Sequence, residues 1–149
     1  SSPSFLIDEH KQYMKKFNSS VEGKKRPKVL VLMGLPGSYV IATNKSYVGS
    51  LVELAGGENV YNDDSKDFLT VNTEEMKTKN PDIILRASHA MPDDVKNMFA
   101  KEFAENDIWK HFDAVQNGKV YDLDNTLFNM SANFNYRNAL EELKKLLYE

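Results

Sequence analysis

The chain has 149 residues, a hydrophobic fraction of 41% and a charged fraction of 28%, which are ordinary for a globular domain able to bury a core. The formal net charge of −3 argues against nucleic acid as a partner, and the absence of cysteine excludes disulfides, thiolate zinc sites and cysteine nucleophiles. No apolar run reaches the roughly 18–20 residues that span a bilayer. The first residues show neither an initiator Met nor a signal-peptide pattern, so we expect a piece of a longer protein.

The first half of the chain predicts two helices and two strands. Residues 4–20 have the apolar spacing of an amphipathic helix. Residues 28–33 form a continuous apolar run, which is typical of a strand covered on both faces. After a Gly- and Pro-containing turn at residues 34–38, residues 47–55 predict a second helix, and residues 59–61 predict a short strand.

The second half begins with a capping signal. Asn72 followed by Glu75 resembles a capping box, and the helix that it starts should end before Pro81. Residues 82–86 are the next clear strand, and Pro92 is well placed as the first residue of another helix. The remaining expected elements are a helical segment at 108–115, a strand at 119–123 and a terminal helix at 135–148.

This alternation of strands and helices predicts an α/β fold with a mainly parallel sheet and helices on both faces. In such folds ligands bind outside the carboxyl ends of the strands. His89 occupies that position, because it follows the strand at 82–86 and precedes the helix at Pro92. It is one of three histidines in the chain, and a histidine there is a candidate metal ligand or acid–base group.

Two other motifs suggest phosphate chemistry. Asp122-Leu123-Asp124 resembles the first motif of haloacid dehalogenase-type phosphatases, in which the first Asp attacks phosphorus and the second is the general acid–base beside Mg²⁺. In that family further motifs follow downstream, whereas little chain follows here. We therefore favour a strand that runs into a polar turn and keep the Mg²⁺-dependent phosphatase as an alternative. Residues 34–38 lack the Gly-Lys-Ser/Thr ending of a phosphate loop, which argues against nucleotide binding.

Several longer strings point to one family. Residues 29–39, Leu51-Val52-Glu53-Leu54-Ala55-Gly56-Gly57-Glu58-Asn59-Val60 and Asn80-Pro81-Asp82-Ile83-Ile84 together resemble the C-terminal lobe of ABC-transporter substrate-binding proteins for siderophores, cobalamin and heme. Arg86-Ala87-Ser88-His89-Ala90-Met91-Pro92 and Asn106-Asp107-Ile108-Trp109-Lys110-His111-Phe112 are more narrowly similar to IsdE-type heme-binding lipoproteins of Gram-positive bacteria. The resemblance covers nearly the whole chain from about residue 5 onward.

The resemblance implies a two-lobed protein that holds heme in the cleft between its lobes. Residues 4–22 would then be the end of the connecting helix, and residues 27–149 the C-terminal, Rossmann-like lobe. In that family the heme iron takes a His from this lobe and a Met from the other, and His89 matches the His. The resemblance places further residues at the heme: Met33, Leu35, Tyr39, Met91 and Met130 against the porphyrin, and Arg86 paired with a propionate or with an internal carboxylate.

The same resemblance implies a binding module, not an enzyme, that delivers heme to an ABC permease. Glu74 matches an acidic residue that docks to the permease, although a first-turn Glu is also favoured by the helix dipole alone. The full-length protein would be lipid-anchored at the extracellular face of the cytoplasmic membrane. A ferric siderophore or a corrinoid is the alternative ligand. An isolated lobe would expose its cleft face, which favours self-association.

Overall fold

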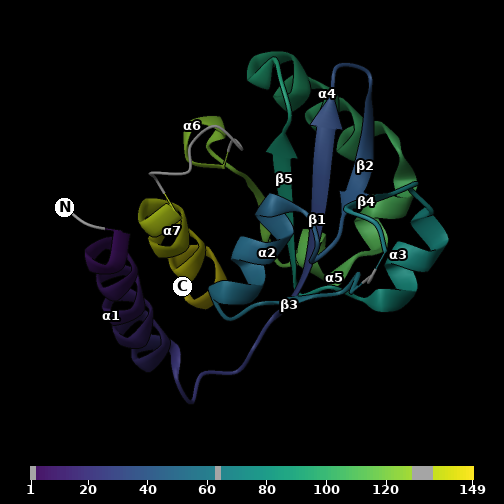
Figure 1. Ribbon diagram of the computed structural model, residues 1–149. Helices are drawn as coiled ribbons and strands as arrows, with labels where there is room; N and C mark the ends of the chain where they lie inside the picture. Colours follow the sequence, from purple (N-terminus) through teal and green to yellow (C-terminus); the bar gives the residue numbers. More distant parts are fainter. Residues whose placement is uncertain (1–2, 63–64, 129–135) are drawn as a thin grey trace.

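A mixed six-stranded sheet lies between two layers of helices in the computed structural model, which describes residues 3–62, 65–128 and 136–149 (Figure 1). The strands are β1 (Lys28–Leu35), β2 (Ser38–Ala42), β3 (Glu58–Asn59), β4 (Phe68–Leu69), β5 (Ile83–Ser88) and β6 (Val120–Asp122). The helices are α1 (Pro3–Val21), α2 (Tyr47–Leu54), α3 (Thr73–Lys79), α4 (Pro92–Glu105), the 3₁₀ helix η1 (Asp107–His111), α5 (Asp113–Gln116), α6 (Asn125–Phe128) and α7 (Tyr136–Tyr148).

The strand order is β4-β2-β1-β5-β6, and β3 pairs with the first two residues of β1. β1 pairs in parallel with β3 and β5, and β5 pairs in parallel with β6. The β1–β2 and β2–β4 pairs are antiparallel. The predicted α/β fold with a mainly parallel sheet is confirmed, and an antiparallel edge is added to it.

The antiparallel edge arises from a tight turn between β1 and β2. Leu35 pairs with Ser38, so that Pro36 and Gly37 occupy the two central positions of the turn. Gly37 has φ +83°, and Pro followed by a residue with positive φ is the combination that a type II turn favours. The sequence predicted this turn, but the strand that follows it was missed.

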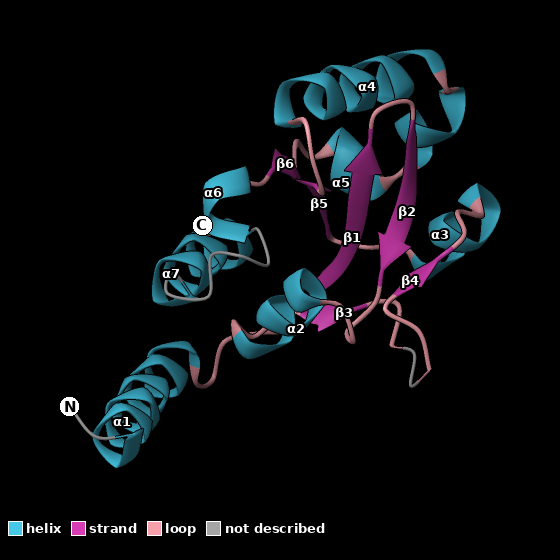
Figure 2. Ribbon diagram, turned by 45° about the horizontal axis from the view of Figure 1, so that its top comes forward, coloured by secondary structure: helices cyan, strands magenta, loops and turns pink. Residues whose placement is uncertain are grey.

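The two faces of the sheet carry separate apolar clusters. Alternate residues of β1 and β5 point to opposite faces, and α2, α6 and α7 cover one face, which includes Val31 and Leu85. Helix α1 lies outside this layer and packs against α7. Helices α3, α4, η1 and α5 cover the other face, which includes Leu32 and Ile84 (Figure 2). Because both faces are covered, the strands consist of continuous apolar runs, as the sequence indicated.

Local signals set several helix boundaries as predicted. The Asn72 side chain accepts a hydrogen bond from the Glu75 N–H at 3.1 Å and begins α3, and Pro92 is the first residue of α4. The expected helix at 108–115 is instead η1 followed by α5, because Phe112 between them has the extended backbone angles φ −82° and ψ 130°. No helix in the described part of the chain is long and apolar enough to cross a membrane.

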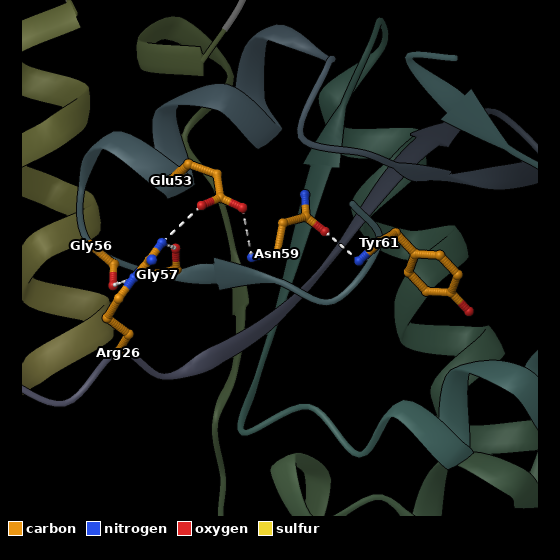
Figure 3. Close-up of polar contacts among 6 residues, drawn as sticks. All are labelled: Arg26, Glu53, Gly56, Gly57, Asn59 and Tyr61. Atoms are coloured by element: carbon orange, nitrogen blue, oxygen red, sulfur yellow. Dashed lines mark hydrogen bonds and ion pairs between the residues drawn. The ribbon is translucent and has the colours of Figure 1, made fainter. Parts of the chain in front are cut away.

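Hydrogen bonds around the Leu-Ala-Gly-Gly-x-Asn string connect α2 to β3 (Figure 3). Arg26 donates to Glu53 Oε2 and to the Gly57 carbonyl, both at 2.8 Å. Glu53 Oε1 in turn accepts the Asn59 N–H at 3.2 Å, and Asn59 Oδ1 accepts the Tyr61 N–H at 2.9 Å. These contacts lie at the start of β1, where Lys28 pairs with Glu58. They are therefore at the end of the strands opposite to His89.

Candidate ligand-binding site at the carboxyl edge of the sheet

His89 directly follows β5 and is held to the end of β1. Its N–H donates to the Gly34 carbonyl at 3.1 Å, which continues the parallel β1–β5 pairing by one residue beyond Ser88. Gly34 allows α4 to lie close, because a Cβ there would collide with Val95 and Phe99. The imidazole is exposed. His89 therefore has a fixed backbone and a side chain free to meet a ligand.

The segment between His89 and α4 is tightly turned. Met91 has a left-handed backbone with φ +52°, which is uncommon for a residue other than glycine. The Ser88 hydroxyl donates to the Ala90 carbonyl at 2.9 Å, and Pro92 fixes the first φ angle of α4. These constraints limit the positions that the His89 side chain can take.

A small hollow of about 100 Å³ lies beside His89. Most of its lining is apolar, and it combines the ends of β1 and β5 with the start of α2, with β4 and with α6. The residues that line it are Met33, Ser46, Tyr47, Val48, Phe68, Ser88, His89 and Phe128.

Large apolar side chains are exposed around the hollow. Leu35, Phe68 and Met91 are 37%, 42% and 57% exposed, and they are three of the four exposed large hydrophobic residues in the described part of the chain. Leu35 ends β1, Met91 follows β5, and Phe68 itself lines the hollow. Leu35 and Met91 are therefore apolar side chains exposed near the carboxyl ends of β1 and β5, and contiguous exposed apolar surface is typical of binding sites.

The predicted pocket residues divide into two groups. Met33 lines the hollow with His89, while Leu35 and Met91 are exposed at the same edge. Tyr39 packs in the apolar cluster on the face of the sheet opposite to Met33. Successive positions along paired strands point to opposite faces, and Met33 and Tyr39 occupy successive positions. Met130 lies outside the described residues.

The hollow also contains residues that the sequence analysis did not single out. Tyr47 and Val48 begin α2, Phe68 belongs to β4 and Phe128 ends α6. These residues are far from His89 in the chain, and no local pattern links them to it. The apolar character of residues 47–55 was the one available signal, and it indicated the core.

Tyr39 instead belongs to a hydrogen-bonding cluster around Glu102. Glu102 Oε2 accepts from the Tyr39 hydroxyl at 2.9 Å, from Trp109 Nε1 at 2.8 Å and from Asn106 Nδ2 at 3.0 Å. Burial, followed by the hydrogen bond to Glu102 and its negative charge, raises the pKa of Tyr39. The Asn-Asp-Ile-Trp string therefore anchors η1 to α4 and to the β1–β2 hairpin and does not contribute to the hollow.

Arg86 makes its polar contacts within the chain. Its Nε and Nη2 donate to the two carboxylate oxygens of Asp122 at 2.7 and 2.8 Å, and its side chain is 12% exposed. The guanidinium also lies over the rings of Phe103 and Phe99, 4.8 and 5.5 Å from their centroids. Of the two alternatives left open by the sequence, this geometry favours the internal ion pair over a propionate contact.

The same ion pair bears on the phosphatase alternative. Both carboxylate oxygens of Asp122, the would-be nucleophile, accept hydrogen bonds from Arg86. Asp122 ends β6, which pairs with β5 at the edge of the sheet. Among the described residues, no group of three or more His, Cys, Asp or Glu side chains could hold a metal ion. The Asp122-Leu123-Asp124 motif is therefore interpreted as a structural strand end.

Glu74 lies away from the hollow, on the surface of the molecule. It is the second residue of α3 and is exposed, as is the neighbouring Glu75. The two remaining histidines are also accounted for. His10 Nδ1 lies 2.8 Å from the Tyr136 hydroxyl, which joins α1 to α7, and His111 is exposed at the end of η1.

A doubly covered α/β fold with a histidine and an apolar hollow at the carboxyl ends of its strands has the architecture of a ligand-binding protein. Residues 5–127 match the family described as periplasmic binding protein, and the chain belongs to this family. The family consists of binding proteins, not enzymes, as the sequence analysis expected.

Known relatives specify the branch of the family. The high-affinity heme uptake system protein IsdE of Staphylococcus aureus strain RF122 is 53% identical over 132 residues, which are 89% of this chain and 45% of that protein. The crystal structure of S. aureus IsdE complexed with heme superposes with a TM-score of 0.89 at 49% identity, covering 98% of this chain and 57% of that one. The predicted resemblance to IsdE-type proteins is confirmed.

A second solved structure agrees. An ABC transporter substrate-binding protein from Listeria monocytogenes has a TM-score of 0.88 and 52% identity, over 97% of this chain and 56% of that one. The chain therefore spans about half the length of the proteins that it matches.

Proposed function

We propose that this chain is the C-terminal lobe of a heme receptor and that the His89 imidazole coordinates the heme iron. The observation that carries the proposal is the position of His89: its backbone is fixed by Gly34, and its exposed ring stands beside an apolar hollow. The close relatives named above, one of them solved with heme, support heme as the ligand.

The residues at this edge suit a metalloporphyrin. Histidine is a common axial ligand of heme iron, and a porphyrin offers a wide apolar face. Leu35, Phe68 and Met91 are exposed and apolar at the edge where that face would lie. The second axial ligand would come from the other lobe, as the resemblance implies, so that this lobe supplies half of the coordination.

The chain titrated with hemin should show a shifted Soret band that saturates at one heme per lobe. His89→Ala should abolish the shift, because the lobe then loses its iron ligand. His111→Ala is the matched control, since His111 is also exposed but lies on η1. Equal spectra for wild type and His89→Ala would refute the assignment of His89. A ferric siderophore or cobalamin that displaced hemin would favour the alternative ligands.

We further propose that Glu74 contacts the permease and that the complete receptor works at the extracellular face of the cytoplasmic membrane, held there by a lipid anchor. The exposure of Glu74 at the start of α3, away from the hollow, supports this role. In the complete receptor, Glu74→Ala should lower heme uptake by cells and leave hemin affinity unchanged. Glu105→Ala, an exposed carboxylate at the end of α4, is the control. Uptake that is unaffected by Glu74→Ala would contradict the docking role.

A further inference from the structure

The hollow beside His89 is a gap in the apolar packing at the carboxyl ends of β1 and β5. Met33, Val48 and Phe128 line it, and all three belong to the apolar cluster on this face of the sheet. Its volume of about 100 Å³ exceeds an ordinary packing defect, because voids larger than a water molecule, roughly 30 Å³, are few in protein interiors. The exposed residue His89 lines the same hollow. A ligand held by His89 would therefore lie against an unfilled apolar space.

The hollow offers no cation to a charged group. The hydroxyls of Ser46 and Ser88 are hydrogen-bonded within the chain, and the Tyr47 hydroxyl is sealed from solvent. None of the described residues that line the hollow is a lysine or an arginine, and Arg86 is bound to Asp122. A carboxylate that entered the hollow would lose its hydration without gaining a cationic partner.

The size and the lining of the hollow indicate a short hydrocarbon arm. An apolar cavity of about 150 Å³ holds a benzene molecule, so a hollow of about 100 Å³ has room for a somewhat smaller group. The rim of heme carries apolar methyl and vinyl groups and charged propionates. Of these, the vinyl group combines a fitting size with an apolar surface. Phe68 lines the hollow and is 42% exposed, so an arm that enters would also cover part of its ring.

We propose that the hollow receives a vinyl arm of the heme whose iron is bound by His89 and that it thereby sets the orientation of the ligand. This inference rests on the proposed function and deepens it. The apolar edge of the porphyrin then lies against β1, β4, α2 and α6, which line the hollow, and the propionates point away from it. The hollow is thus a specificity determinant, which favours porphyrins with vinyl arms over those without them.

The test uses the full chain with two probes, hemin and deuterohemin, which share the iron and the propionates but differ in the vinyl groups that deuterohemin lacks. Wild type should bind hemin about 10-fold more tightly, the size expected from burying the carbons of one vinyl group. Phe68→Ala should weaken hemin binding several-fold more than deuterohemin binding, because it removes one wall of the hollow. Leu54→Ala is the matched control, since Leu54 is 48% exposed but is absent from the lining, and it should bind both probes like wild type.

A variant that fills the hollow provides a readout of opposite sign. Val48→Ile adds one carbon to a buried side chain of the lining, so it should reduce the preference for hemin to about 3-fold or less. It should be at least as stable as wild type in urea, because the added carbon occupies existing space. Lower stability would show that the hollow has no such space and would overturn the proposal.

The affinities of the two probes separate this proposal from the proposed function. Equal affinity of wild type for hemin and deuterohemin would overturn the vinyl site, as would a preference that Val48→Ile retains in full. Equal loss of both probes in Phe68→Ala would place Phe68 against the porphyrin face and would also contradict the proposal. Wild-type chain that binds neither probe, or a Soret shift that survives His89→Ala, would instead refute the proposed function itself.

Discussion

Replacing Glu102 by alanine is expected to destabilise the protein more than the same replacement of any other carboxylate residue on α4. One oxygen of Glu102 accepts three hydrogen bonds, from Tyr39, Asn106 and Trp109. The three donors belong to β2, to the residue that precedes η1, and to η1 itself. The variant therefore removes the shared acceptor that joins α4 to both neighbours.

The cost follows from the burial of each donor. Trp109 is fully buried, so its Nε1 would have no alternative partner, at about 1–3 kcal/mol. Tyr39 is half-buried and contributes less, because its hydroxyl can reach water, and the exposed Asn106 contributes almost nothing. Glu102→Ala should therefore cost about 2–4 kcal/mol, and Glu102→Gln, which keeps one acceptor oxygen, about half of that.

Urea denaturation followed by fluorescence measures this directly, since Trp109 is the single tryptophan of the chain. The m-value should stay constant, so that the midpoint reports stability. Glu105→Ala, an exposed carboxylate on the same helix, should change stability by less than about 0.5 kcal/mol. The pKa of Tyr39 should also fall in Glu102→Ala, because the hydrogen bond and charge of Glu102 contribute to raising it. Equal midpoints for the Glu102 and Glu105 variants would refute the reasoning.

Two further predictions concern packing and pH. Gly34→Ala should lower the free energy of unfolding by about 1–3 kcal/mol, because the new methyl group collides with Val95 and Phe99. The double variant with Val95→Ala tests this: if the two single effects on stability simply added, the collision would be disproved. Stability should fall as the pH rises above about 10. Burial and Glu141 raise the pKa of Tyr13 to about 12, and the pKa of Tyr39 is raised too. In this pH window the folded chain therefore holds more protons than the unfolded chain, and folding becomes less favourable as the pH increases. Urea midpoints that stay constant from pH 9 to 11.5, or a Tyr39→Phe variant with an undiminished pH dependence, would argue against this.

Features governed by neighbouring residues in the chain were predicted well. Asn72 and Pro92 begin helices where the sequence indicated, because capping and the fixed φ of proline act within one turn. Strand β5 extends to Ser88, two residues beyond the expected end, because Ala87 and Ser88 pair with the end of β1. Strand β2 was missed for the same reason, since its strand character depends on pairing across the hairpin with residues 32–35.

The residues of the candidate site also divide into those that local sequence predicted and those that only the folded structure placed. His89 was identified from its place at a strand end, and the family strings on either side predicted that it binds heme iron. Tyr39 was expected beside it but lies in the other apolar cluster, bound to Glu102. Arg86 was expected to pair with a propionate or internally, and the choice required knowing that Asp122 lies beside it on the neighbouring strand.

The sequence by itself determined the alternation of helices and buried strands, the family and the position of His89, because each depends on residues close together in the chain or on a contiguous string. The tertiary structure alone decided what surrounds His89. Tyr47, Phe68 and Phe128 reach the hollow from three separate elements, and the sheet's order and facing bring them together. A binding surface built from distant segments has no local pattern in the chain, so its composition is readable only once the chain is folded.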